Sequence, residues 1–181
     1  MKNLPRLAAS LLLAMSTFAA TPLQEIPLKD IDGKPTSLKS YSGKVVLVVN
    51  VASKCGLTPQ YEALEGIYKK YQAKGLVVVG FPCNDFAGQE PGTADEIKTF
   101  CSTKYNVTFP LMSKLHVKGP EQHPLYTHLT GKDAKFPGDI EWNFGKFVVG
   151  RNGEVLARFS PKTKPDDAEI IAAIESALKA K

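Results

Sequence analysis

A nearly unbroken run of branched apolar residues at positions 44–51 constrains this chain more than any other stretch. Such a run is typical of a strand that is buried on both faces of a sheet. Beyond it the pattern changes, and Thr58 and Pro59 fit the N-cap and the first turn of a helix. Cys55 is therefore expected where a central strand gives way to a helix, which is where sites collect in open α/β sheets. The helix dipole and neighbouring Lys54 both favour a thiolate, so we predict that Cys55 is a nucleophile.

The periodicity of the remaining sequence predicts a single α/β domain. A helix over 57–71 that ends at Gly75 and a second buried strand over 76–81 make a right-handed βαβ unit with parallel strands. Residues 93–96 form a capping box that opens another helix. The other predicted elements are a hairpin within 21–43, a short edge strand over 109–112, a short helix over 124–129, a hairpin of 147–149 with 155–159, and a final helix over 165–180. We expect the parallel strands in the middle of the sheet and the second hairpin at one edge.

The N-terminal stretch has the pattern of an export signal. Lys2 and Arg6 precede a short apolar run, and small residues follow it, so we expect a signal peptide over 1–19, cleaved near Ala19, and an exported, periplasmic domain over 20–181. The apolar run is too short to span a bilayer. Losing the two cations lowers the formal net charge from +5 to +3, a balance compatible with weak contact to membrane phosphates. The Lys/Arg stripe of nucleic-acid binders does not occur.

The chain contains three cysteines, at positions 55, 83 and 101, which is an odd count for an exported protein. This count indicates at least one thiol outside a simple structural pair. No Cys-x-x-Cys occurs, and the three histidines form no zinc-ligand pattern with the cysteines. The sequence also has neither a Gly-rich phosphate loop nor a Gly-x-Ser-x-Gly elbow. We therefore expect no metal and no cofactor.

Three separated stretches of sequence carry further information. They are residues 50–58 around Cys55, residues 81–92 with the sequence FPCNDFAGQEPG, and residues 142–147 with the sequence WNFGKF. In this order and spacing they resemble the glutathione peroxidase family, and the likeness extends over about residues 26–178. The resemblance implies a thioredoxin-like α/β fold, with a central mixed β-sheet flanked by helices and an N-terminal β-hairpin.

The resemblance also implies a catalytic tetrad of Cys55, Gln89, Trp142 and Asn143. Side-chain amides and the indole are neutral N–H donors, and hydrogen bonds to a charged group contribute about 1.5–3 kcal/mol each. Such donors can stabilise a thiolate and the leaving hydroxide without fixing the sulfur in an ion pair. Taken singly, Cys55 could be a small apolar residue, Gln89 a solvated loop residue and Trp142 a core aromatic. The three stretches together favour the functional interpretation.

The chain departs from the family pattern at two positions near Gln89. Asp85 stands where Gln is common and Ala87 where Gly is common, so the loop that positions Gln89 could differ in shape. The family also includes selenocysteine members, and the ordinary cysteine at position 55 implies a lower intrinsic reactivity. Between residues 124 and 142 the chain lacks the long insertion of tetrameric relatives, which implies a monomer with an open site for bulky hydroperoxides.

Cys101 resembles the resolving cysteine of the thioredoxin-dependent members of the family. Attack on a peroxide would leave Cys55 as a sulfenic acid that must be reduced before it oxidises further. A disulfide requires Cα atoms within ~7 Å, so we expect the two sulfurs apart in the reduced form and the helix from Thr93 to unwind on oxidation. Cys101 could instead be a core residue on the face of Ile97. Cys83 is interpreted as a structural residue, and a role as the resolving cysteine is its second interpretation.

The leading hypothesis is a thiol peroxidase of the thioredoxin-dependent, two-cysteine type. It would reduce hydrogen peroxide and organic or lipid hydroperoxides to water or alcohols, form a Cys55–Cys101 disulfide, and be recycled by a thioredoxin-like protein. The alternatives are a peroxidase that uses glutathione directly and a peroxide sensor that relays its oxidation to a partner protein. A thioredoxin-like disulfide reductase is disfavoured by the missing Cys-x-x-Cys.

Overall fold

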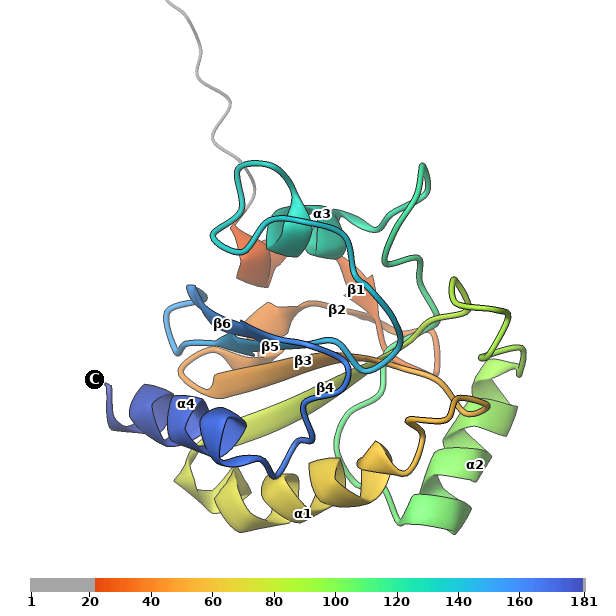
Figure 1. The fold of residues 1–181 in the computed structure, drawn as a ribbon, viewed down its shortest axis with the longest axis horizontal. Coiled ribbons are helices and arrows are strands. Elements are labelled where there is room, and N and C mark those ends of the chain that lie inside the picture. The colour runs from red at the N-terminus through yellow and green to blue at the C-terminus, as the bar shows by residue number, and fades with distance from the viewer. Residues whose placement is uncertain (1–21, 181) are drawn as a thin grey trace, which may run out of the picture.

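The computed structural model describes residues 22–180, so the expected export signal and its cleavage point lie outside the described residues. A four-stranded sheet forms the middle layer of the molecule (Figure 1). The elements, in chain order, are η1 (Leu23–Glu25), β1 (Leu28–Lys29), β2 (Pro35–Thr36), η2 (Leu38–Tyr41), β3 (Val45–Val51), α1 (Gln60–Tyr71), η3 (Gln72–Lys74), β4 (Leu76–Pro82), α2 (Ala94–Tyr105), α3 (Pro124–Thr130), β5 (Lys146–Val149), β6 (Val155–Phe159) and α4 (Ala168–Lys179).

The sheet is mixed, with the strand order β4-β3-β5-β6. Strand β3 pairs parallel with β4 and antiparallel with β5, and β5 and β6 form the second hairpin. The expected mixed sheet and both hairpins are confirmed, including the short N-terminal pair β1–β2. The expectation that the parallel strands lie in the middle was wrong for β4, which is an edge strand, because β5 takes the place on the other side of β3.

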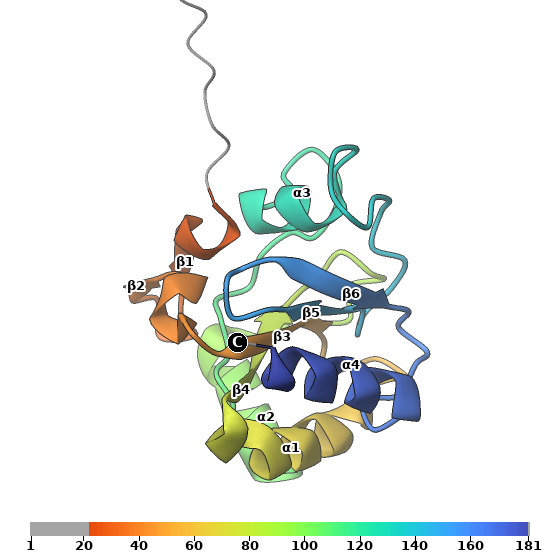
Figure 2. The ribbon, with the colours of Figure 1, turned by 90° about the vertical axis from the view of Figure 1, so that its left-hand side faces the viewer.

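Helices cover both faces of the sheet. In the two perpendicular views, α1 and α4 lie on one side of it, while α3 and the N-terminal hairpin lie on the other (Figures 1 and 2). Helix α2 contacts α1. None of the helices within residues 22–180 is long and apolar enough to cross a bilayer.

Strand β3 contributes to two separate apolar clusters. Val45, Leu47, Val49 and Val51 belong to the cluster on the α1 and α4 side, whereas Val46 and Val48 belong to the cluster on the α3 side. Successive side chains of a strand point to opposite faces, so all seven residues of β3 are buried. This confirms the prediction made from the apolar run.

Some predicted boundaries shift by a few residues. Helix α1 begins only at Gln60, because the Thr58 hydroxyl does not cap a helix: it accepts the Cys55 N–H at 3.0 Å and donates to the Ala52 carbonyl at 2.9 Å. Helix α4 likewise begins three residues after the expected start. Residues 109–112 contribute two isolated bridges rather than a strand. The capping box at the start of α2 is present as predicted.

Candidate active site

Cys55 lies in the turn between the end of β3 and the start of α1, as the sequence predicts. Its side chain is 8% exposed, and the backbone N–H of Leu57 donates to Sγ at 3.4 Å. The bond from the Cys55 N–H to Thr58 closes the turn from the other side. The sulfur therefore lies in the turns that lead from β3 into α1.

The structure brings the segments that carry Gln89, Trp142 and Asn143 to this turn. The Lys54 N–H donates to the Gln89 carbonyl at 3.0 Å, which attaches the Gln89 loop next to Cys55. The Asn143 amide donates from Nδ2 to Gln89 Oε1, also at 3.0 Å. Trp142 is 37% exposed and packs against Phe86 with ring centroids 5.4 Å apart. It is therefore a surface residue rather than the core aromatic of the plainer interpretation.

The amides of Gln89 and Asn143 bond to each other in this structure. Within residues 22–180, the donor at hydrogen-bond distance from the Cys55 sulfur is the Leu57 backbone, and no side-chain donor lies at that distance. Asn143 is fully buried, and its Oδ1 has no hydrogen-bond partner among the described protein atoms. A direct bond from the tetrad donors to a thiolate remains a prediction.

Asn50, in β3, fixes the backbone of the Trp142–Asn143 segment, a role that sequence reasoning missed. Its Nδ2 donates to the Trp142 carbonyl at 3.1 Å, and its own carbonyl accepts the Phe144 N–H at 2.6 Å. Phe144 has a φ of 71°, in the left-handed region that non-glycine residues rarely adopt. The available signal was a lone amide inside an otherwise apolar strand.

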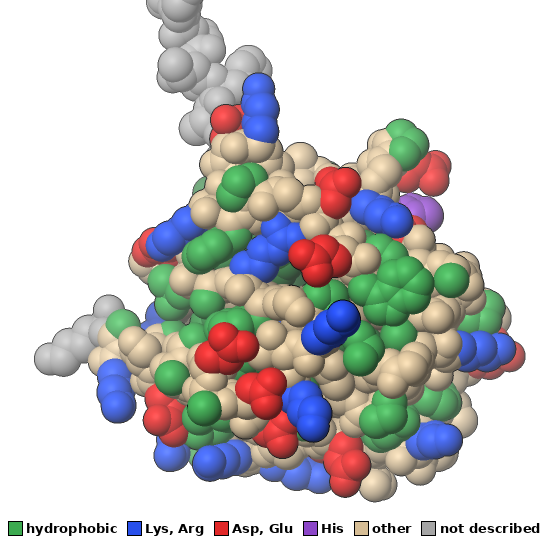
Figure 3. Space-filling view, viewed as in Figure 1, with side chains coloured by type: hydrophobic (Ala, Val, Ile, Leu, Met, Phe, Trp, Pro, Cys, Tyr) green, Lys and Arg blue, Asp and Glu red, His purple; other side chains and the backbone are tan. Residues whose placement is uncertain are grey.

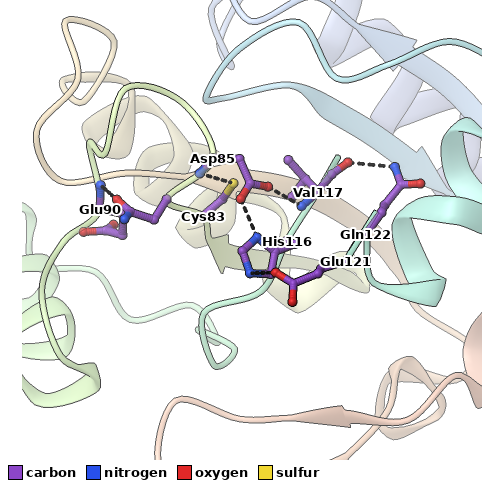
Figure 4. A network of polar contacts seen from close by, with 8 residues as sticks. Cys83, Asp85, Glu90, His116, Val117, Glu121 and Gln122 are labelled. Atoms are coloured by element: carbon purple, nitrogen blue, oxygen red, sulfur yellow. Dashed lines mark hydrogen bonds and ion pairs between the residues drawn. The ribbon is translucent and has the colours of Figure 1, made fainter. Parts of the chain in front are cut away.

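The Gln89 loop contains two acidic residues that fix its position, Glu90 and Asp85, and both are labelled in Figure 4. Glu90 is fully buried, accepts a bond from the Ser53 hydroxyl at 2.5 Å, and has an unpartnered Oε2. Burial raises the pKa of Glu90 above its usual value, and the Ser53 bond opposes that shift. Ser53 lies two residues before Cys55, so this contact also ties the loop to the nucleophile turn. The sequence assigned no role to either residue.

Asp85, one of the two departures from the family pattern, anchors the other end of the loop (Figure 4). Its carboxylate contacts His116 Nδ1 at 2.6 Å and accepts the Val117 N–H at 2.7 Å. Burial acts to raise the pKa of Asp85, but the bonds from Val117 and His116 together hold it below its usual value. Ala87, the other departure, has a φ of 53°, so it keeps a left-handed turn that favours glycine.

The other two cysteines occupy different surroundings. Cys83 is fully buried in the cluster on the α3 side of the sheet, the opposite side from Cys55, and burial raises its pKa to about 12. Cys101 is 1% exposed on α2, in the same cluster as Cys55, and burial raises its pKa to about 11. All three thiols are free. Within residues 22–180 no cluster of His, Cys, Asp and Glu is suited to hold a metal ion.

Comparison with known proteins defines first the fold and then the family. A thioredoxin-family thiol:disulfide interchange protein from Chlorobium tepidum superposes with a TM-score of 0.61 at 21% identity, covering 90% of this chain and 99% of that one. The chain thus has a thioredoxin-like fold. A family model described as glutathione peroxidase matches residues 23–130.

Two curated relatives extend this match over most of the chain. The hydroperoxy fatty acid reductase Gpx2 of Synechocystis is 55% identical over 151 residues, 83% of this chain and 96% of that protein. The thioredoxin/glutathione peroxidase BtuE of Escherichia coli is 48% identical, covering 83% of this chain and 94% of that protein. The chain belongs to the glutathione peroxidase family, and it is a peroxidase.

Proposed function

We propose that this peroxidase reduces hydroperoxides through Cys55, with Gln89, Trp142 and Asn143 completing its catalytic tetrad. The Cys55 thiolate attacks one oxygen of the O–O bond, an S–O bond forms, and the O–O bond breaks. The sulfur becomes a sulfenic acid and loses two electrons, and the leaving oxygen takes a proton to give water or an alcohol. The observation that carries this proposal is the pair of contacts Asn143 Nδ2–Gln89 Oε1 and Lys54 N–Gln89 O, which gather neutral donors at the nucleophile turn.

Cys101 is proposed as the resolving residue. Its thiol displaces the sulfenic oxygen of Cys55 as water, which leaves a Cys55–Cys101 disulfide. Both cysteines belong to one apolar cluster, while Cys83 lies across the sheet, so Cys101 is the better placed partner. Because Cys101 is buried within α2, the helix has to open for the bond to form. Helix opening of this kind draws on local unfolding at modest free-energy cost.

The proposed electron donor is a thioredoxin-like dithiol, with glutathione as the alternative. The name of the E. coli relative contains both reductants, so it does not separate them. The test is Cys101→Ser, assayed with a thioredoxin system and with glutathione. Loss of turnover with thioredoxin alone supports the proposal. Equal turnover of the variant and the wild type with thioredoxin would contradict the resolving role.

Lipid hydroperoxides are proposed as substrates beside hydrogen peroxide. The Synechocystis relative carries hydroperoxy fatty acids in its name, and Trp142 is exposed and packs against Phe86 in the Gln89 loop. Cationic and anionic side chains are interspersed on the face seen in Figure 3, so contact with a membrane surface is proposed to be weak. A monomer is proposed as well. Rates with hydrogen peroxide and with a fatty acid hydroperoxide, measured side by side, test the substrate class, and light scattering of the purified protein tests the monomer.

Export to the periplasm is proposed from the sequence of residues 1–19 alone. The mature chain would then need reducing equivalents that are supplied outside the cytosol, because thioredoxin and glutathione are kept reduced in the cytosol. Mass spectrometry of the protein recovered from a bacterial periplasmic fraction tests this point. A mature mass that begins near residue 20 supports export, and an intact N-terminus in the cytosolic fraction contradicts it.

A further inference from the structure

Lys146 is a charged residue at a place in the sheet where an apolar one would be expected. It is the first residue of β5, paired with Val49 of β3 and Phe159 of β6, and it is fully buried. Its amine donates to the carbonyls of Phe144 at 2.7 Å and Pro161 at 3.4 Å. Among the described residues no carboxylate lies within ion-pair distance of it. An isolated buried cation is costly, so the amine must contribute something that an aliphatic side chain could not.

The backbone that the amine contacts is the segment of the tetrad. Phe144 follows Asn143 directly and is held in its left-handed conformation. Its N–H is bound by Asn50 from β3, and its carbonyl is bound by Lys146 from β5. The N–H of Phe144 is thus fixed by a backbone carbonyl of β3, and the carbonyl of Phe144 is fixed by a side chain of β5. A segment held at both ends keeps the Asn143 side chain at one distance from Gln89.

We propose that Lys146 is a positioning residue for this peroxidase, whose amine holds the Phe144 carbonyl so that the Asn143 amide stays against Gln89 beside Cys55. This inference rests on the proposed function of the tetrad. It assigns Lys146 no contact with the substrate or the sulfur, so its effect is exerted through Asn143.

The protonation state of the amine is compatible with this role. Burial lowers the pKa of Lys146 to about 7, and Asp167 acts in the opposite direction. A neutral amine carries two N–H bonds and an ammonium carries three. The amine can therefore donate to the carbonyls of both Phe144 and Pro161 in either protonation state, so its proposed role does not require a positive charge.

Gln60 offers a matched control for Lys146. Its Nε2 donates to the same Pro161 carbonyl, at 2.8 Å, and it is also buried. No described hydrogen bond joins Gln60 to Phe144 or Asn143. Lys146→Met and Gln60→Met therefore both remove a donor from Pro161, but only Lys146→Met releases the Phe144 carbonyl.

The experiment compares these two variants with the wild type. We expect Lys146→Met to lower the second-order rate constant for peroxide by about 10- to 100-fold, as is typical when a residue that orients a metal ligand is lost. The pH profile of Cys55 alkylation by iodoacetamide should also move up by about one pH unit. Gln60→Met should stay within about twofold of the wild type in both measurements. Equal behaviour of the two variants, or an unchanged rate and profile in Lys146→Met, would overturn the proposal.

Two further variants keep the test decisive. If Lys146→Met does not fold, Lys146→Gln keeps N–H donors on a shorter stem and should show the same loss of rate. Asn143→Ala separates this inference from the proposed function. If Asn143→Ala retains full activity, the tetrad itself fails. If Asn143→Ala is impaired and Lys146→Met adds a further loss in the double variant, Lys146 does not act through Asn143.

Discussion

Cys55 and Cys101 share one apolar cluster, but their immediate surroundings differ. The Cys55 sulfur sits in a turn and accepts a backbone N–H, and the neighbouring Lys54 N–H binds the Gln89 carbonyl. The Cys101 thiol sits inside α2, where burial raises its pKa to about 11. One apolar cluster thus holds a thiol that accepts a backbone N–H in a turn and a thiol that burial keeps protonated. We therefore expect the reactivity of the two thiols to differ through their local backbone, because both are buried.

Replacing Cys55 is the most direct test of the proposed contrast between the two thiols. Cys55→Ser should abolish peroxide consumption, by at least about 1,000-fold, because a hydroxyl in the same turn is a far weaker nucleophile. The measurement is peroxide loss under a saturating reductant, with circular dichroism to verify the fold. Cys83→Ser, which also changes a buried cysteine but across the sheet, should retain the wild-type rate. Residual consumption by Cys55→Ser near the wild-type level would refute the assignment.

The proposed side-chain donors to Cys55, of which Gln89 is one, are the second difference between Cys55 and Cys101 that can be tested. Gln89→Ala should reduce the rate constant for peroxide by about 100-fold, the usual cost of losing one positioned donor at a developing charge. Stopped-flow measurement of the first oxidation isolates this step from recycling. Gln72→Ala, at an exposed glutamine of η3, serves as the control. A rate for Gln89→Ala within about twofold of the wild type would show that the amide does not act on the sulfur.

Local sequence patterns were enough to predict the parts of the fold that local forces decide. The apolar run of β3, the capping box of α2 and the Arg151-Asn152-Gly153 turn of the second hairpin all follow from short-range chemistry. The place of β4 at the sheet edge does not follow from local patterns. No feature of the strand sequences indicates whether β5 pairs with β3 or with β4. The Thr58 boundary failed for a related reason, since its hydroxyl binds the turn of Cys55 instead of a helix N–H.

The sequence predicts which residues belong to the candidate site, but it does not predict the contacts between them. The contact between Asn143 and Gln89 joins residues 54 positions apart and depends on how three loops converge. The buried amine of Lys146 and the buried carboxylate of Glu90 have no local signature, because charged residues of either type are mostly exposed. Lys146 directly precedes the apolar residues 147–149, but Lys44 precedes the apolar run of β3 in the same way and is exposed, so the pattern does not predict burial.

The buried thiol of Cys101 should make the stability of the reduced protein depend on alkaline pH. Its folded pKa, about 11, lies above the usual thiol value, so its contribution to stability is complete only below the usual thiol pKa of about 8.5 and is lost as the pH rises towards 11. Between pH 8 and 10.5 the wild type should lose about 2 kcal/mol more of its unfolding free energy than Cys101→Ala does. Urea unfolding of the reduced proteins measures this difference. Parallel pH dependence of the two proteins would contradict the buried, protonated thiol.

The smallest expected effect concerns the helix that encloses Cys101. Thr93→Ala removes the hydroxyl that accepts the Glu96 N–H at 3.3 Å, while the bond that the Thr93 N–H donates to Glu96 Oε2 at 2.7 Å remains possible. Losing such a cap costs about 1 kcal/mol. If α2 must open before the disulfide forms, the same loss should speed Cys55–Cys101 bond formation by about fivefold after a single oxidation.

Ser37→Ala provides the control for this prediction, because Ser37 caps η2 through Lys39 N and lies outside α2. It should leave the rate of disulfide formation unchanged. Mass spectrometry of alkylated samples quenched at successive times measures both variants. If Thr93→Ala destabilises the protein but forms the disulfide no faster, the sulfurs meet without opening the start of α2, and the contrast between an open and an enclosed thiol must be sought at the other end of that helix.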